Sequence, residues 1–235
     1  IRDLVRSRGL GDVYKRQVPI GLSVDAAIAR LLAEGALGEV RLVRVQSFTD
    51  AFARSDTPLH WRKDHRISGL NMHTLGMYAE VIHRWFGATW AVNAATQTFT
   101  RTRRDPDGTE VRVQIPDQVL CTAGMRAGFP VQYTISAAVH HGEEEIQVFG
   151  SEGSLTYDVN DDVLYGALAG EMMGPVEIRH EEQHNLREWP VERNFIAAIR
   201  EGAEYHPDFF DGLQYMQVVQ AVHDSAREGK TIMLD

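Results

Sequence analysis

The apolar positions of the chain follow two periods, and the change from one to the other divides the sequence into elements. Apolar residues spaced three and four apart predict helices over about 24–32, 71–86, 191–201 and 208–227. Apolar residues at every second position predict strands at 40–48, 92–94, 111–115, 119–125, 131–139, 146–148, 155–159 and 231–234. Residues 49–67 follow neither period and predict a surface loop, longer than loops usually are unless they carry function.

The order of these elements predicts the fold class. A helix, a strand, a long loop and a helix precede a run of strands, and two helices follow an irregular region over 166–188. Such an order favours an α+β fold, with a largely antiparallel open sheet that carries helices on one face. Ser23 is expected to cap the first helix. A nucleotide-binding Rossmann half would alternate strands with helices, so none is expected here.

Composition limits the classes of partner. The chain has 235 residues, is 43% hydrophobic and carries a formal charge of −9. Without a basic stripe to neutralise phosphates, nucleic acid is not expected as a partner. No apolar run has the about 20 residues that cross a bilayer, so no membrane partner is expected. A single cysteine, Cys121, excludes an internal disulfide framework and favours a cytoplasmic location.

The first 17 residues differ in character from the rest. They hold five basic and two acidic residues, against the acidic balance of the whole chain. Their Gly9-x-Gly11 pair starts like a dinucleotide-binding turn, but Tyr14 stands where the third glycine should be and no strand precedes it. We therefore expect 1–17 to be a non-native adaptor or assembly scar, and 18–235 to be the domain.

The sequence HEEQH at 180–184 matches the spacing of two zinc ligands one helical turn apart. Such a helix normally buries one face, whereas this segment has no apolar residue between its histidines. A zinc peptidase is the disfavoured alternative, and we expect no metal site.

Four stretches, taken in order, indicate a family. They read LLAEGALGEVRLVRVQSF (31–48), WRKDHRISGLNMHTLGMYAEVIHRWFG (61–87), IQVFGSEGSLTYD (146–158) and a carboxy-terminal pair of helices over 191–234. Together they resemble the carboxy-terminal domain of the Gfo/Idh/MocA oxidoreductases, which has a sheet like that of dihydrodipicolinate reductase.

The resemblance implies a parent protein whose amino-terminal Rossmann domain binds NAD or NADP. That domain is absent from this chain, so no cofactor is expected to bind the chain alone. The chain would be the substrate-binding and oligomerisation domain of an NAD(P)-dependent oxidoreductase that acts on a CH–OH group of a sugar, polyol or related small molecule. It would form a homo-oligomer through its sheet. The alternative is a non-catalytic binding or assembly domain.

The resemblance also implies a second catalytic element, a turn into a helix that reads GLNMHTLGMY at 69–78. Tyr78 stands in the place of the family's histidine and is the acid/base candidate. Thr74 stands in the place of an aspartate, which is a departure, because a threonine can bond a substrate hydroxyl but carries no charge. From pattern alone, Tyr78 lies on the apolar stripe of its helix and is equally explained as a core residue.

Polar residues around this turn are the candidates for substrate contacts. Arg62 is the preferred one in the long loop, where Lys63 and His65 are also charged or titratable. Asn71 and His73 flank the turn, and either side chain is expected to point into the cleft or to cap the helix.

Overall fold

The computed structural model describes residues 22–168, 170–179, 182, 191–202 and 206–235. The predicted scar at 1–17 and both histidines of the 180–184 motif lie outside the described residues.

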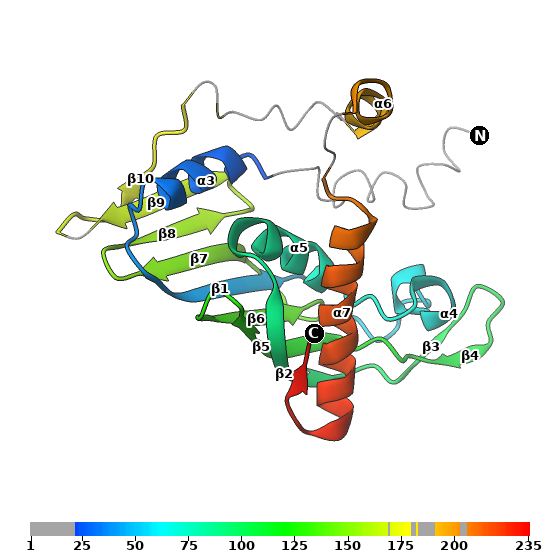
Figure 1. Ribbon diagram of the computed structural model, residues 1–235. Helices are drawn as coiled ribbons and strands as arrows, with labels where there is room; N and C mark the ends of the chain where they lie inside the picture. Colours follow the sequence, from blue (N-terminus) through cyan, green and yellow to red (C-terminus); the bar gives the residue numbers. More distant parts are fainter. Residues whose placement is uncertain (1–21, 169, 180–181, 183–190, 203–205) are drawn as a thin grey trace.

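A single large sheet dominates the described part of the chain (Figure 1). Its strands lie in the order β10-β9-β8-β7-β1-β6-β5-β2-β11. Their bounds are β1 Val40–Phe48, β2 Thr89–Gln97, β5 Gln118–Met125, β6 Pro130–Ser136, β7 Glu144–Gly150, β8 Gly153–Asp158, β9 Val163–Leu168, β10 Gly174–Pro175 and β11 Ile232–Met233. A separate two-stranded ribbon joins β3 (Thr102–Arg104) to β4 (Glu110–Arg112).

The strand pairs of the large sheet are antiparallel except for β1 and β6, which run parallel with Val43 opposite Val131. The predicted α+β class with a largely antiparallel sheet is confirmed. Because β1 and β6 are parallel, their carboxyl ends lie at the same edge of the sheet. This pair sets the position of the candidate site.

Three helices cover one face of the sheet, α3 (Asp25–Ala33), α5 (Leu75–Phe86) and α7 (Phe209–Glu228) (Figure 1). Their apolar sides pack on the inward-facing side chains of the strands to form one core, which includes Ile82, Val222 and Tyr133. The remaining helices are η1 (Trp61–Lys63), α4 (His65–Ser68) and α6 (Val191–Glu201). Among the described helices, none combines the length and the apolar character that crossing a membrane requires.

Three local predictions are wrong. Ser23 does not cap α3, whose N-cap is Val24; the Ser23 hydroxyl instead bonds the Asp162 carboxylate. The region over 166–188, expected to be irregular, begins with the end of β9 and includes β10. The strand expected over 111–115 ends at Arg112 as β4.

The opposite face of the sheet carries the alternate residues of the same strands. In its centre these are polar, including Arg44, Gln46, Gln132 and Gln147. Towards β2, the large side chains of Trp90 and Leu120 are 42% and 47% exposed. Within the described residues, no helix covers this face.

Candidate functional site

A cavity of about 210 Å³ opens where the carboxyl ends of β1 and β6 meet the start of α5. Because the strands end there, polar residues that follow or end them can face the cavity without breaking the sheet. Its lining comes from β1 and the loop after it, from η1, from the turn before α5 and from the end of β6. These residues are Ser47, Thr49, Ala51, Phe52, His60, Arg62, His73, Thr74, Ile135, Ser136 and Ala137.

The long loop between β1 and η1 is held in place from β3. The buried Arg103 guanidinium donates to the carbonyls of Phe52 (3.0 Å), Arg54 (2.9 Å) and Thr57 (3.1 Å), and it also bonds the Thr57 hydroxyl. At the other end, the Phe52 amide donates to the Ala137 carbonyl at 2.7 Å. The predicted loop therefore forms one wall of the cavity.

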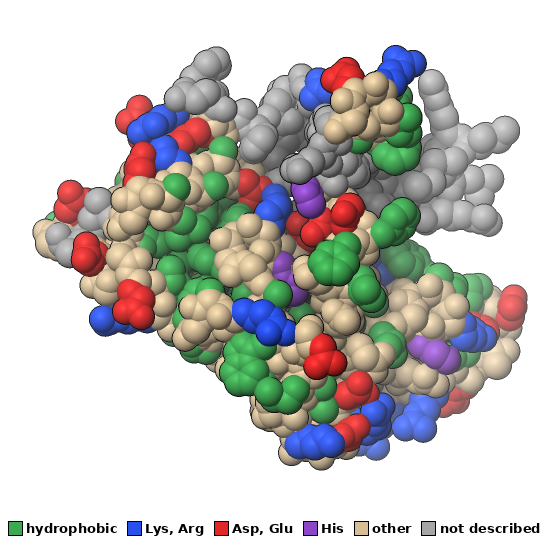
Figure 2. All heavy atoms as spheres, viewed as in Figure 1, with side chains coloured by type: hydrophobic (Ala, Val, Ile, Leu, Met, Phe, Trp, Pro, Cys, Tyr) green, Lys and Arg blue, Asp and Glu red, His purple; other side chains and the backbone are tan. Residues whose placement is uncertain are grey.

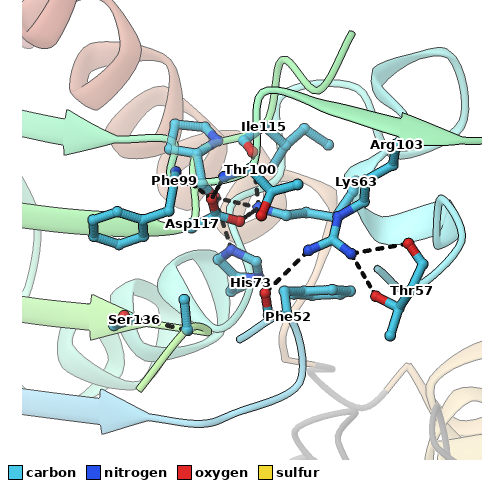
Figure 3. A network of polar contacts seen from close by, with 12 residues as sticks. Phe52, Thr57, Lys63, His73, Phe99, Thr100, Arg103, Ile115, Asp117 and Ser136 are labelled. Atoms are coloured by element: carbon cyan, nitrogen blue, oxygen red, sulfur yellow. Dashed lines mark hydrogen bonds and ion pairs between the residues drawn. The ribbon is translucent and has the colours of Figure 1, made fainter. Parts of the chain in front are cut away.

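Behind this wall lies a fully buried ion pair, Lys63 with Asp117 at 2.6 Å (Figure 3). The Lys63 ammonium also donates to the carbonyls of Ile115 and Pro116, both at 2.9 Å. Burial lowers the pKa of Lys63, and the Asp117 carboxylate opposes that effect. With a carboxylate and two carbonyls around it, the ammonium keeps its proton, so Lys63 is a structural residue and does not face the cavity as a substrate ligand.

His73 is oriented by the same structure. Its Nε2 lies 2.8 Å from the Pro116 carbonyl, which can only accept, so Nε2 carries the proton and Nδ1 is left as an acceptor. Burial, followed by the nearby Lys63 charge, lowers the pKa of His73 to about 4. Its backbone has φ of +54°, an uncommon conformation outside glycine, and the residue lines the cavity. His73 is therefore a neutral imidazole in the cavity lining, with Nδ1 as its acceptor atom.

Thr74 and Ser47 lie side by side in the lining. The Thr74 hydroxyl donates to Ser47 Oγ at 2.9 Å, and the Ser47 hydroxyl donates to the Glu144 carboxylate at 2.6 Å. Ser47 shares the inward face of β1 with Val43 and is 1% exposed. Glu144, the first residue of β7, is directly opposite Ser47 in the antiparallel register.

Tyr78 lies one turn into α5 and is completely buried. Its hydroxyl has no hydrogen-bond partner of good geometry among the described residues, and it is not part of the cavity lining given above. Burial, and then the negative charge of Glu144, raises the pKa of Tyr78, an effect that the nearby Ser47 hydroxyl opposes only weakly. The described residues therefore present it as a core side chain, and its assignment as acid/base stays a prediction.

The two remaining predicted ligands differ in position. Arg62 lines the cavity, and its guanidinium lies 4.2 Å from the centre of the Trp61 ring. Asn71 is exposed in the turn before α5 and is outside the cavity lining. The structure thus brings Arg62, His73 and Thr74 together at one cavity and leaves Asn71 apart from it.

Ser47, Ser136 and Glu144 were missed in the sequence. For two of them a signal exists, because Ser47 takes the inward-facing place after Val43 and Val45, and Glu144 shares its face with Ile146. A polar residue on an apolar face is informative about function or pairing.

Several reactive side chains outside the cavity have structural roles. Burial raises the pKa of Cys121 to about 12, which agrees with a small core residue. Glu182, inside the HEEQH motif, pairs with Arg30 and accepts from the Arg179 amide at 2.9 Å. Asp208 and Asp211 form the capping box of α7.

Comparisons with known proteins identify a family. The GFO/IDH/MocA C-terminal domain family matches residues 26–156, more than half of the chain. Levoglucosan dehydrogenase of Pseudarthrobacter phenanthrenivorans is 23% identical over 91% of this chain and 63% of its own length.

Solved structures share the fold. A levoglucosan dehydrogenase in complex with NADH and levoglucosan superposes with a TM-score of 0.79 at 21% identity, over 91% of this chain and 64% of that one. The aldose-aldose oxidoreductase from Caulobacter crescentus complexed with glycerol gives 0.72 at 22% identity, over 91% and 61%. The chain therefore spans less than two thirds of each of these proteins. The family match and the shared fold together show that this chain belongs to the GFO/IDH/MocA C-terminal domain family.

Proposed function

We propose that this chain is the substrate-binding domain of an NAD(P)-dependent oxidoreductase that oxidises a CH–OH group of a sugar, a polyol or a related small molecule. The single observation that carries the proposal is the cavity at the ends of β1 and β6, where Arg62, His73 and Thr74 meet. Thr74 and His73 belong to the turn whose sequence resembles the family's catalytic element.

The chemistry of the lining suits a polyhydroxylated ligand. A guanidinium donates only, the Nδ1 atom of His73 accepts, and hydroxyl groups such as that of Ser136 do both. Adjacent hydroxyls of a sugar need such alternating partners. The volume of about 210 Å³ is below the about 300–1,000 Å³ of pockets that take drug-sized ligands, and therefore favours a small one.

The cavity does not fit a dinucleotide. It is too small, and the described residues include no strand, glycine-rich turn and helix in the order that binds pyrophosphate. When bound, a nicotinamide cofactor supplies the acceptor for the hydride of the oxidised carbon. We assign its binding to a further domain, and the cavity to the substrate.

Two exposed apolar surfaces are evidence that the chain is part of a larger assembly. Figure 2 shows hydrophobic side chains on α6 and near the amino-terminal end of α7. In these two helices Phe195, Ile199 and Phe210 are 55%, 68% and 63% exposed. Trp90 and Leu120 on the open face of the sheet form the second surface. Exposed apolar groups of this kind are typical of interfaces, and we assign them to a further domain and to a homo-oligomer formed through the sheet.

The test is cofactor reduction by the protein that carries the nucleotide-binding domain. The probe panel is glucose, xylose, myo-inositol, levoglucosan and glycerol, each with NAD and with NADP. Turnover with at least one member is expected, and Arg62→Ala should raise its KM roughly tenfold or more, as for the loss of a hydrogen bond to a charged group. Arg101→Ala, which removes an exposed arginine outside the cavity, is the matched control.

If the panel binds without turnover, the rival function of a non-catalytic binding domain is favoured. If neither binding nor turnover is found, the proposal is overturned.

A further inference from the structure

A line of hydrogen bonds leads from the cavity to a carboxylate behind it. Thr74 and Ser47 both line the cavity, and Glu144 lies on the far side of Ser47. The two links measure 2.9 Å from Thr74 to Ser47 and 2.6 Å from Ser47 to Glu144.

The direction of donation along this line is fixed by elementary chemistry. A carboxylate can only accept, so the one proton of the Ser47 hydroxyl points to Glu144. Ser47 Oγ must then accept from Thr74, whose own proton is used in that bond. No donor among the described residues contacts Thr74 Oγ1, so its lone pairs remain for a hydroxyl in the cavity.

The line of hydrogen bonds shows where a carboxylate could take the place of the aspartate that Thr74 replaces. The resemblance implies a carboxylate at this place, and here a neutral hydroxyl stands there instead. Glu144 supplies a carboxylate two hydrogen bonds away. Tyr78, the other candidate base, is completely buried, and its hydroxyl makes no hydrogen bond of good geometry within the described part of the chain.

We propose that Thr74 and Ser47 form a proton relay from the substrate hydroxyl to Glu144. Thr74 Oγ1 accepts the substrate proton while the Thr74 proton moves to Ser47 Oγ and the Ser47 proton moves to Glu144. Three O–H bonds break and three form, and Glu144 ends as a carboxylic acid. The hydride of the same substrate carbon leaves to an oxidised nicotinamide, so the inference rests on the proposed function.

In this scheme Thr74 is the catalytic residue, because it touches the substrate. Ser47 and Glu144 act through it and are positioning residues. Glu144 is half-buried at the start of β7 beside the exposed Glu143, so its proton can pass to solvent after each turnover.

The first part of the test needs no cofactor. In the 235-residue chain, the 13C chemical shift of the Glu144 carboxyl is measured by NMR at neutral pH. Ser47→Ala should move this signal because it removes the hydrogen bond at 2.6 Å. Glu143→Gln, which removes the neighbouring exposed carboxylate, should leave it in place. An unmoved Glu144 signal in Ser47→Ala would overturn the relay.

The second part uses the cofactor-loaded protein and the probe panel. Glu144→Gln and Thr74→Val should each lower kcat on the order of 10²-fold, the low end of general acid–base contributions, with little change in KM. Thr74→Ser, which keeps the hydroxyl, should retain most of the activity. In mixtures of H₂O and D₂O the wild type should show a curved dependence of kcat, because several protons move together, and Ser47→Ala should not.

Circular dichroism confirms that each variant is folded before its kinetics are compared. If Glu144→Gln matches Glu143→Gln in kcat while the wild type turns over, the relay alone is overturned. If the wild type turns over no member of the panel, the proposed function fails, and the relay fails with it.

Discussion

The buried Lys63–Asp117 pair should dominate the stability of the wall behind the cavity. Both side chains are 0% exposed, and the pair joins η1 to the segment before β5. Lys63→Met would leave the Asp117 carboxylate buried without its cation and would remove the donor to the Ile115 carbonyl, whereas the Pro116 carbonyl would keep the His73 Nε2 donor. Removal of one partner of a buried pair costs about 3–5 kcal/mol.

The expected change in melting temperature follows from the size of the domain. At about 2–4 °C per kcal/mol for a chain of this length, Lys63→Met should lower Tm by roughly 6–20 °C. The double variant Lys63→Met/Asp117→Asn removes both charges, so its loss should be smaller than the sum of the single losses. The difference measures the coupling, expected to be on the order of 2 kcal/mol.

Urea denaturation of the wild type, both single variants and the double variant completes the cycle. Arg54→Met is the control, because it breaks the Arg54–Asp56 pair, whose side chains are 73% and 66% exposed. That variant should leave the unfolding midpoint unchanged. Additive single losses, or a loss for Lys63→Met as small as the control's, would show that the buried pair does not stabilise this wall.

Three further predictions concern single side chains. Burial holds the pKa of His73 at about 4, against 6.5 for the free side chain, so between these pH values the unfolded chain takes up a proton that the native protein does not. The free energy of unfolding should therefore fall as the pH drops from about 6.5 to 4. His73→Asn should flatten this dependence on pH, and a slope equal to that of the wild type would contradict the lowered pKa of His73. Tyr78→Phe removes a buried hydroxyl that makes no hydrogen bond of good geometry within the described residues, so thermal melts should show an equal or higher Tm. A loss above about 1 kcal/mol would show that the hydroxyl is bonded. Gly150→Ala would place a Cβ 2.0 Å from the Leu37 carbonyl oxygen and should lower the free energy of unfolding by about 1–3 kcal/mol in urea denaturation. In the control Gly174→Ala, the added Cβ meets nothing within 4 Å, and an equal loss of stability in both variants would contradict the clash.

The local hydrophobic pattern predicts most of the helices and strands, because the period of apolar residues and the turn residues between elements are local properties of the sequence. The strand expected over 40–48 is β1, and the helix expected over 191–201 is α6. Ser23 failed as a cap because the Asp162 carboxylate, far along the chain, takes its hydroxyl. The two-residue strand β10 has no periodicity to detect.

The site was predictable only where a motif covered it. The turn at 69–78 indicated His73 and Thr74, and both line the cavity. The partnership of Ser47 with Glu144 depends on a strand register across almost one hundred residues, which no local pattern specifies. The sequence places Lys63 among the charged residues of the long loop, and nothing near it in the sequence shows that Asp117 is its partner.

The proposed function depends on substrate binding in the cavity at the ends of β1 and β6. The most direct test is NMR of the isotope-labelled 235-residue chain, titrated with each member of the probe panel. We expect saturable shifts at Ser47, Thr74 and Ser136, with none at Thr156 on the open face of the sheet. Shifts confined to the open face, or no shift at these three residues with any member of the panel, would contradict it.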